Sequence, residues 1–494
     1  MAIYERHQPE KTILYQTVAR AWPKISLEYA LEGETIPRHV EAEFDRYRRC
    51  GILDYGFVRL YCKACDAERL VGFSCKGRSF CPSCGARRRD QTAERLAGDV
   101  WPVANARQWV LSFPHQVRYW LSRDTALFTD VMSAVTEVIA NFYEQHTLSY
   151  DERGNVYAPS AGAVAFVQLF GSSLVLNPHL HLIFLDGVYG RGRDGLRFYP
   201  HPSFTTEAMF DVLYAIHDRL GAVFRRCGYV RDDGEAGEPE HADDISMPFR
   251  PRAPKAYRRK GRLLDHANYQ HSDPDQMSME GWCNVRYKWL SLHAGVAIKG
   301  EDRDGLKRLF RYAARSSVAV SQLSYVTPED PDRSDVELKL KRTWRDGTGS
   351  LVFTQRDFVE KLASLVPQPW FNLTRYYGVF ASAHVWREFI VPMGKRKKRL
   401  CPAHDEPEGG TPPPPTKPST GRAPAEYWIP WAELLLRTIG VDPEICVCGA
   451  KMTVDDAITE PEKITETLAR LGIESTGPPK AMRSTGELDY IYDC

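Results

Sequence analysis

One apolar segment with two histidines, Asn177–Gly187, constrains the fold of this chain more than any other stretch. Successive side chains of a strand point to opposite faces, so His179 and His181 would lie on the same face. The residues around them are apolar on both faces, which predicts a central strand in a covered sheet. Two imidazoles on one face could bind a metal ion together, although a single histidine on such a strand is more often a hydrogen-bonded core residue.

Further segments of strand and helix length surround this strand. Strands are predicted at 108–113, 163–170, 178–185 and 289–298, and helices at 124–146, 205–226 and 303–315. Two of these strands read as a hairpin, and the helices are long enough to cover a sheet. The predicted fold class is therefore α+β, with a mainly antiparallel sheet and covering helices.

The chain has 494 residues, which is too long for one ordinary core. The expected units are a helical segment at 1–48, a zinc ribbon at 49–100, an α+β domain at 101–330 with a polar insertion at 228–284, an extension at 331–400, a Pro-rich linker at 401–426 and a small module at 427–494. No run of residues is long and apolar enough to span a bilayer, and residues 2–12 are too polar for a secretory leader. A cytoplasmic protein without membrane contact is expected.

Cysteine spacing predicts a structural zinc ion. The chain has 12 cysteines, and in a reducing compartment paired cysteines favour metal binding over disulfides. The pairs Cys62–Cys65 and Cys81–Cys84 are spaced as in a zinc ribbon, so these four thiolates are predicted to bind one Zn²⁺. Such a site supplies folding energy and leaves no open position for catalysis.

Of the eight cysteines that are not assigned to this zinc ion, four lie near it or in a second close pair. Cys50 and Cys75 are expected to be reduced buried thiols, with Cys75 as a possible substitute ligand. Cys446 and Cys448 are separated by a single residue, which makes a second zinc site doubtful.

Local basic clusters, and not the overall charge, would provide nucleic-acid contacts. Lysine and arginine number 65 against 64 acidic residues, so the formal net charge is only +1. The cluster Arg87, Arg88 and Arg89, with Lys76 in the preceding loop, could lie along phosphates beside the predicted zinc ribbon. A solvated charged helix start would have the same sequence.

The predicted helix at 303–315 carries a tyrosine flanked by arginines. Arg308, Arg311 and Arg315 surround Tyr312. Arginine binds phosphate oxygens in a bidentate way and stabilises a phenolate, and a tyrosine oxygen can act as a covalent nucleophile. Taken without the histidines, Tyr312 would more often be a packing residue.

Together these motifs resemble the rolling-circle transposases of the insertion-sequence-91 type, members of the HUH superfamily of single-strand endonucleases. The resemblance covers roughly residues 50–460. The motifs that carry it are Cys62-x-x-Cys65, Ser74–Lys76, Phe80–Gly85, Arg107–Pro114, Gln168–Ser172, Asn177–His181, Ser291–Ala294, Arg311–Arg315, Leu340–Thr348 and Leu373–Val379.

The resemblance implies nicking of single-stranded DNA by a tyrosine with a divalent metal ion, Mg²⁺ or Mn²⁺. In this chain His179 and His181 would bind the ion, and Tyr312 would form a 5′-phosphotyrosine intermediate that permits strand transfer, with Arg311 and Arg315 beside it. The expected partners are single-stranded DNA and transposon ends. The chain has no Walker motif, so no nucleotide triphosphate is expected.

Several roles remain open in this interpretation. A third metal ligand is needed, and His293 and Gln168 are the candidates, with a second hydrogen-bonding shell as the alternative for both. Arg375 and Tyr376 could stack on unpaired bases or simply pack. The position four before the tyrosine is Arg308, so the chain fits the single-tyrosine branch.

Two other functions are weighed against transposition. A replication initiator or relaxase of the same superfamily would nick DNA but would not recognise transposon ends. A non-catalytic, zinc-dependent DNA-binding regulator would bind DNA without cleaving it.

Overall fold

A computed structural model describes the chain in ten segments. They are 7–147, 159–192, 195–202, 205–230, 258–259, 262–263, 278–279, 283–344, 346–392 and 442–474. The expected linker at 401–426 and most of the expected insertion at 228–284 lie outside them. Among the described helices, none has both the length and the apolar character that crossing a membrane requires.

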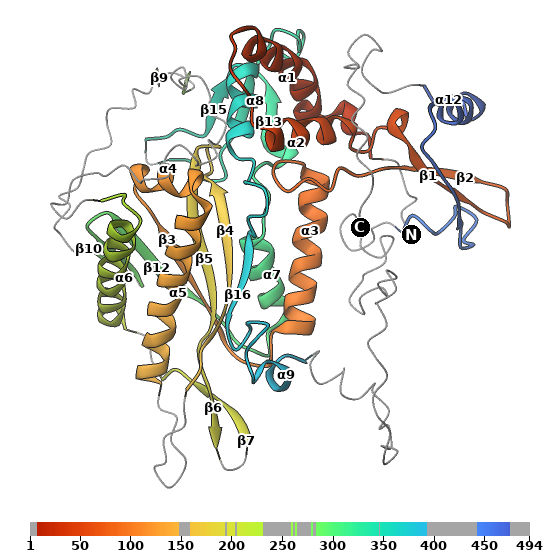
Figure 1. The fold of residues 1–494 in the computed structure, drawn as a ribbon. Helices are drawn as coiled ribbons and strands as arrows, with labels where there is room; N and C mark the ends of the chain where they lie inside the picture. The colour runs from red at the N-terminus through yellow and green to blue at the C-terminus, as the bar shows by residue number, and fades with distance from the viewer. Residues whose placement is uncertain are drawn as a thin grey trace, which may run out of the picture.

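A seven-stranded sheet forms the centre of the molecule (Figure 1). Its order is β10 (Ser278–Met279), β11 (Asn284–Tyr287), β12 (Leu290–Ile298), β3 (Ala106–Ser112), β5 (Leu176–Leu185), β4 (Gly162–Phe170) and β16 (Thr374–Gly378). Every neighbouring pair is antiparallel. The four predicted strands and the antiparallel α+β class are confirmed, and β5 is an inner strand as predicted.

Helices cover both faces of this sheet. α5 (Thr125–His146) and α6 (Thr206–Arg226) pack on one face, and α7 (Arg303–Ala313) with α3 (Pro82–Arg95) packs on the other (Figure 1). Asp124 caps α5 by accepting hydrogen bonds from two backbone N–H groups of its first turn. The three predicted helices are therefore present with nearly the predicted bounds.

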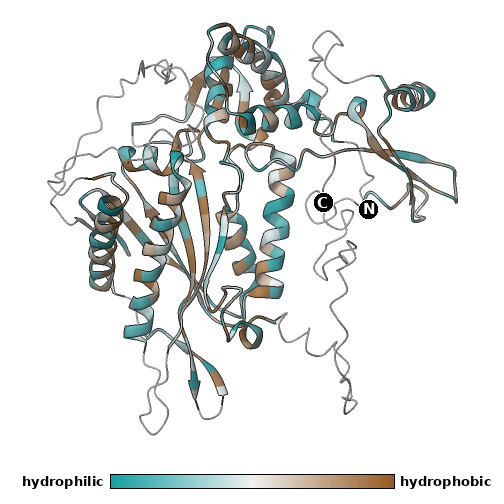
Figure 2. Cartoon of the chain, viewed as in Figure 1, coloured by the Kyte–Doolittle hydropathy of each residue, from teal (hydrophilic) through white to brown (hydrophobic). Residues whose placement is uncertain are grey.

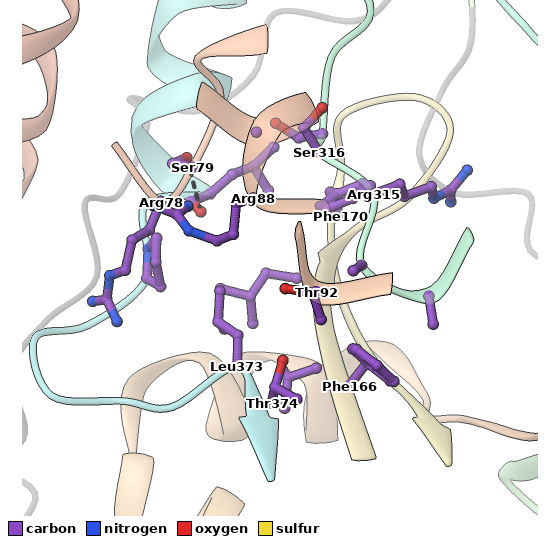
Figure 3. Close-up of a pocket in the computed structure, with 18 of the residues that line it drawn as sticks. Arg78, Ser79, Arg88, Thr92, Phe166, Phe170, Arg315, Ser316, Leu373 and Thr374 are labelled. Atoms are coloured by element: carbon purple, nitrogen blue, oxygen red, sulfur yellow. Dashed lines mark hydrogen bonds between the residues drawn. The ribbon is translucent and has the colours of Figure 1, made fainter. Parts of the chain in front are cut away.

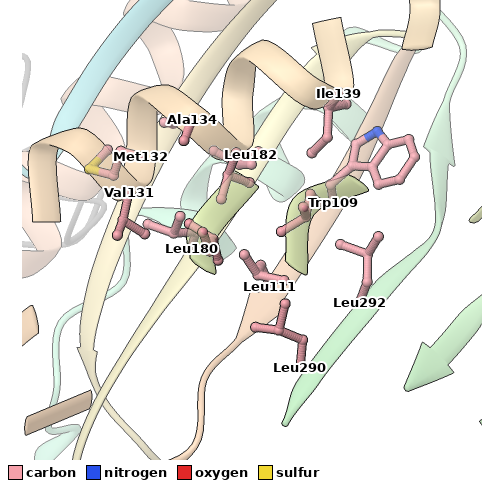
Figure 4. Close-up of a cluster of buried hydrophobic side chains, with 14 of the residues drawn as sticks. Trp109, Leu111, Val131, Met132, Ala134, Ile139, Leu180, Leu182, Leu290 and Leu292 are labelled. Carbon is pink, nitrogen blue, oxygen red and sulfur yellow. The ribbon is translucent and has the colours of Figure 1, made fainter. Parts of the chain in front are cut away.

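The side chains of β5 alternate between the two faces. Leu180, Leu182 and Phe184 enter the core beneath α5. Figure 4 shows Leu180 and Leu182 in this core with Trp109 and Leu111 of β3. Ile183 and Leu185 enter the core beneath α7 on the opposite face. This double burial explains the continuous apolar sequence, and Figure 2 shows the central strands mostly in the hydrophobic colours. By the same alternation, both histidines face α7.

A buried ion pair lies where β5 ends. The Arg107 guanidinium bonds to both carboxylate oxygens of Asp186 at 2.8 and 2.9 Å, and the Tyr143 hydroxyl donates to the same carboxylate at 3.0 Å. Both charged side chains are buried, so the attraction between them offsets the free-energy cost of removing each charge from water.

Replacing Asp186 by alanine should destabilise the protein by about 3–5 kcal/mol, because it leaves the Arg107 charge buried without its partner. Urea unfolding followed by circular dichroism measures this loss. The matched control is Asp130→Ala, which removes an exposed ion pair with Arg226 and should cost about 1 kcal/mol or less. Equal effects of the two substitutions would contradict the assigned role of the buried pair.

A second core joins segments from the two halves of the chain. It contains α1 (Ile13–Leu31), α2 (Arg38–Arg49), α8 (Gln355–Ser364) and strands β13 (Leu323–Tyr325), β14 (Val336–Lys339) and β15 (Ser350–Phe353). Trp22 of α1 stacks on Phe44 of α2 with ring centroids 3.8 Å apart. The short strands β8 (Arg258–Arg259) and β9 (Arg262–Leu263) extend the sheet of β15. The N-terminal helices therefore pack on residues 323–364, which lie between α7 and β16 in the chain.

A third, three-stranded sheet is built from both ends of the described chain. Its order is β17 (Thr453–Ile458), β1 (Phe57–Tyr61) and β2 (Glu68–Gly72), all antiparallel. α12 (Pro461–Arg470) packs beside it on η2 (Leu53–Tyr55). The predicted ribbon is thus completed by residues of the expected C-terminal module.

The remaining elements are short. They are η1 (Pro9–Lys11), the π-helical turn η3 (Leu96–Val100), α4 (His115–Arg123), the hairpin β6 (Gly187–Gly192) and β7 (Gly195–Pro200), η4 (Val320–Gln322) and α9 (Arg387–Ile390).

Candidate active site and metal centres

The central strand β5 places His179 and His181 on the sheet face that α7 covers. Their ring centroids are 5.0 Å apart, and both side chains are buried. On the neighbouring strands, His179 lies opposite Ser112 and Gln168. The pair therefore sits inside the sheet and not at its wet edge.

Hydrogen bonds orient the two imidazoles. The Nδ1–H of His179 donates to the Asn177 carbonyl at 2.7 Å, which leaves its Nε2 lone pair free to bind a ligand. His181 Nδ1 lies 2.8 Å from the side-chain amide of Gln108, and its Nε2 is buried without a hydrogen-bond partner. When the side-chain amide of Gln108 is turned so that its oxygen accepts from the Nδ1–H of His181, the Nε2 of His181 carries no proton. This Nε2 then also offers a lone pair to a ligand.

Burial keeps both imidazoles neutral. Desolvation, with a smaller contribution from the positive charge of Arg315, lowers the pKa of His179 to about 4 and that of His181 to about 3. A histidine must be neutral to bind a metal ion, so the environment favours the ligand form at neutral pH. The unpartnered Nε2 and these neutral rings fit a divalent cation.

The tyrosine helix meets the histidines directly. The ring of Tyr312 is perpendicular to that of His181, with centroids 5.6 Å apart, and its side chain remains half exposed. The Arg315 guanidinium carbon lies 5.2 Å from the centre of the Tyr312 ring. An exposed phenol therefore stands beside buried histidines and a cation, which is an arrangement suited to a phosphate group.

Gln168 holds the end of α7 in this position. Its amide nitrogen donates to the backbone oxygens of Tyr312 at 3.2 Å and Ala313 at 2.8 Å, and its oxygen accepts from Arg315 at 3.2 Å. All polar atoms of this side chain are thus used between β4 and α7. The structure therefore shows Gln168 holding α7 against β4, and its role as third metal ligand stays a prediction.

Two other predicted site residues lie elsewhere. His293 of β12 shares the sheet face with His181, but β3 separates their strands, and no third His, Cys, Asp or Glu ligand joins the histidine pair within the described residues. Arg311 pairs with Asp90 at 3.1 Å and Glu94 at 3.5 Å on α3. The roles of His293 as a metal ligand and of Arg311 in catalysis stay predictions that the described structure does not test.

Gln108 is the site residue that the sequence interpretation missed. It belongs to β3, where it is surrounded in sequence by apolar strand residues. Its side chain points to the same side of the sheet as the histidines. Its position in the motif Arg107–Pro114 was the only available signal.

A cavity of about 280 Å³ opens next to the end of α7. Figure 3 shows it between residues of α3, β4 and β16, with Phe166, Phe170 and Leu373 as its apolar wall. Arg78 and Arg88 line another part, although their guanidinium groups already bond to backbone carbonyls. The cavity is mixed apolar and basic, which suits a nucleotide better than an apolar ligand.

The predicted DNA-contacting residues have unequal surroundings. Arg88 binds the carbonyl of Lys76, so these two residues stabilise their own loop, and Arg89 pairs with Asp90 at 2.9 Å. Arg87, beside them on α3, is partly buried.

On β16, Arg375 donates to Thr129 at 3.0 Å, and Tyr376 packs into the core on the opposite face. Both residues of this strand therefore have packing roles in the described structure, and the structure leaves their predicted contact with DNA untested.

The cysteines form two clusters, and this corrects the predicted zinc ligands. One cluster contains Cys50, Cys75, Cys81 and Cys84, and the other contains Cys62, Cys65, Cys446 and Cys448. The predicted set of Cys62, Cys65, Cys81 and Cys84 is thus divided between two places. The reason is that β1 carries the first pair toward β17, whereas the second pair lies at the start of α3.

The first cluster has the dimensions of a tetrahedral zinc site. Its Sγ–Sγ distances are 3.7 Å from Cys50 to Cys81, 3.8 Å from Cys50 to Cys84 and 3.5 Å from Cys75 to Cys84. Zinc–sulfur bonds of about 2.3 Å give tetrahedral edges of about 3.8 Å. The backbone N–H of Cys75 also points at the Cys50 sulfur, at 3.3 Å, and stabilises a thiolate there.

Two family models match the sequence. One, described as "Transposase zinc-binding domain", matches residues 18–113, and the other, described as "Putative transposase", matches residues 162–387. No curated protein and no solved structure matches the chain. The first match contains the first cysteine cluster, and the second contains both histidines and the tyrosine helix.

Both descriptions name a transposase, so the class of the protein is a DNA-processing enzyme that moves a genetic element. The zinc-binding model is that of the insertion-sequence-91 transposases, and the chain belongs to this family. A structural zinc ion at the first cluster agrees with this membership.

Proposed function

We propose that this transposase nicks single-stranded DNA with Tyr312 as nucleophile and a divalent metal ion, and then transfers the strand by a rolling-circle mechanism of the HUH type. One observation carries the proposal. The Tyr312 phenol lies against His181, whose Nε2 is buried and unpartnered, and His179 is beside it. A phenol that could act as nucleophile, two neutral imidazoles that could bind a metal ion, and the Arg315 cation thus lie close together, which supports the proposal.

In the proposed reaction, Tyr312 Oη attacks the phosphorus of the scissile phosphodiester and loses its proton to solvent. The bond from phosphorus to the 3′ oxygen breaks, and this oxygen takes a proton to become a 3′-OH. The 5′ phosphate stays on the tyrosine as an ester. A 3′-OH of another strand can then attack this ester, so strand transfer needs no nucleotide triphosphate.

The residues around the phenol have separate roles in this reaction. Arg315 can donate to the phosphate oxygens while its guanidinium stays beside the phenolate, and Gln168 keeps the end of α7 against β4. His179 and His181 would hold Mg²⁺ or Mn²⁺ through their Nε2 atoms, and the chemistry supplied there is neutralisation of charge on the scissile phosphate. Tyr312 is the one tyrosine used, as in the single-tyrosine branch.

We place an unpaired nucleotide of the substrate in the cavity at the end of α7, whose lining begins at Ala313, next to Tyr312. The cavity at the end of α7 is lined by Arg315, Phe166 and Phe170, and an unpaired base could stack there while its phosphate reaches Tyr312. Arg87, Arg89 and Lys76 extend a basic surface from the same helix α3 and its preceding loop, and we assign the adjoining DNA strand to it.

Incubation of the protein with labelled single strands from candidate element ends, with Mn²⁺, tests this function. The expected result is a covalent adduct on denaturing gels, a released strand with a 3′-OH, and a tryptic peptide in which Tyr312 carries the 5′ phosphate. Cleavage without an adduct, or an adduct on another residue, would contradict the mechanism. Binding without any cleavage would instead support a zinc-dependent regulator, and nicking that ignores element ends would support a replication initiator or relaxase.

Replacing Gln108 by leucine should weaken Mn²⁺ binding by about 10–100-fold, because the residue orients the His181 ring through Nδ1. Calorimetric titration of the protein with Mn²⁺ measures the affinity without DNA. Gln108→Glu keeps an oxygen that accepts from Nδ1–H, and it should retain most of the affinity. Wild-type affinity in the leucine variant, with the fold intact by circular dichroism, would remove Gln108 from the site.

A further inference from the structure

Four cysteines from opposite ends of the described chain meet beside the third sheet. The Sγ atoms of Cys62 and Cys448 are 3.6 Å apart, and those of Cys65 and Cys446 are 3.4 Å apart. All four sulfur atoms lie within 4.8 Å of one another. Sulfur atoms of a disulfide are about 2.05 Å apart, whereas a zinc tetrahedron has edges of about 3.8 Å. The spacing therefore fits four thiolates around one ion.

Each pair of cysteines, Cys62 with Cys65 and Cys446 with Cys448, lies in a tight backbone turn. In the first turn the N–H of Cys62 donates to the Ala67 carbonyl at 2.9 Å, and in the second the N–H of Cys446 donates to the Ala450 carbonyl at 2.9 Å. Gly449 has φ +86°, a conformation that favours glycine and closes the second turn within five residues. This turn explains how two cysteines separated by a single residue can serve one site.

Strand pairing and charged side chains bring the two turns together. β17 pairs with β1 from Phe57 opposite Ile458 to Tyr61 opposite Thr453. Arg69 of β2 donates to the Ile445 carbonyl at 3.0 Å, next to the second turn. None of these contacts involves a cysteine sulfur atom. The fold around the two turns therefore brings the cysteine pairs together by itself.

The apolar cluster beside the four cysteines is small. Its buried members are Leu60, Cys62, Cys446 and Met452. A second cluster, of six buried residues, packs β17 and α12 against β1, β2 and η2. Small units of this kind require a staple such as a metal ion or a disulfide. Cys65 and Cys448 are exposed, so burial does not explain why four thiols gather here.

We propose that Cys62, Cys65, Cys446 and Cys448 bind a second structural zinc ion, which fastens residues 442–474 to the β1–β2 hairpin. The zinc-binding family match ends at residue 113 and therefore contains only half of these ligands. The site is separate from the proposed nicking reaction, and its test does not depend on DNA cleavage. Its function is to join the two ends of the described chain through one ion.

Alkylation of the wild-type protein tests the proposal without any substitution. Cys65 and Cys448 are exposed, so without a metal ion they should react with N-ethylmaleimide at once. In the zinc-loaded protein we expect both to be protected from alkylation. After a chelator removes the zinc, all four cysteines of the cluster should become reactive together, and mass spectrometry of the alkylated peptides follows this. Immediate alkylation of Cys65 and Cys448 in protein that has been saturated with zinc would overturn the proposal.

Zinc content measured by mass spectrometry provides the second test. The wild-type protein should carry two zinc ions per chain, one for each cluster. The pair of substitutions Cys446→Ser and Cys448→Ser should reduce this to one, and Cys62→Ser with Cys65→Ser should remove the same ion. The variant with all four substitutions should still carry one zinc ion per chain.

The control for zinc content is Cys227→Ser, which lies in neither cluster and should keep two ions. Hydrogen exchange should show that the amides of β17 lose protection in the Cys446 and Cys448 variant. A wild-type content of one zinc ion, or two ions retained in that variant, would refute the second site.

Discussion

Replacing Tyr312 by phenylalanine is expected to lower the nicking rate by about 10⁴-fold or more and to abolish the covalent DNA adduct. The substitution removes only the hydroxyl oxygen. The half-exposed ring can keep its edge-to-face contact with His181 and its place beside Arg315. Because the oxygen is the proposed nucleophile, no neighbouring group can replace it. Denaturing electrophoresis with end-labelled single strands measures both effects.

A matched control separates loss of the nucleophile from loss of the fold. Tyr214 on α6 is also exposed, on a helix that covers the other face of the sheet, so Tyr214→Phe should nick at the wild-type rate. Binding of the strand should survive in Tyr312→Phe, because the histidines, Arg315 and the basic surface remain. An adduct formed by Tyr312→Phe would exclude this residue as the nucleophile.

Replacing Cys81 by serine should remove one zinc ion and destabilise the protein by at least about 3 kcal/mol. Structural zinc contributes apparent free energies of about 10–16 kcal/mol in small zinc fingers, and a missing ligand forfeits part of this. The first cluster lies in the core that joins α2, α3 and α8, so the loss should spread to these helices. Zinc content and thermal unfolding measure the two effects.

The same experiment decides how the cysteines are grouped. Cys50→Ser should lose the same zinc ion as Cys81→Ser, because their sulfur atoms are 3.7 Å apart in one cluster. Cys227→Ser should change neither zinc content nor stability. If Cys50→Ser kept all its zinc while Cys62→Ser and Cys81→Ser lost the same ion, the grouping based on sequence spacing would be restored.

Local pattern was sufficient to predict the sheet and the face that carries the histidines. β5 has apolar residues on both faces, and only an inner strand between two helix layers can bury both. Alternation then fixes His179 and His181 on the same side. The helix of Tyr312 was predictable from its period, whereas the face of the sheet that it covers is known only from the structure.

Side-chain partners were harder to predict, because they depend on non-local contacts. Arg311 is adjacent to Tyr312 in sequence, but the helical turn aims it at acidic residues of α3. Gln108 reaches His181 only because β3 and β5 pair in one particular register.

The cysteine groups show the same limit over a longer distance. Cys65 finds its partner Cys446 across 381 residues, a pairing that no spacing rule for neighbouring cysteines contains. β16 was likewise considered as a DNA contact because of its Arg and Tyr residues, whereas the structure uses it as an outer strand beside β4.

The pairing of β17 with β1 also has a consequence for biosynthesis. A ribosome that adds about 5–20 residues per second needs roughly 20–75 s to make the 381 residues between Cys65 and Cys446. During this time the β1 edge of the nascent hairpin stays open, in addition to the β2 edge, and two thiols lack their partners. A message cut short between codons 392 and 442 would therefore yield a polypeptide with a finished central sheet and an unfinished N-terminal ribbon.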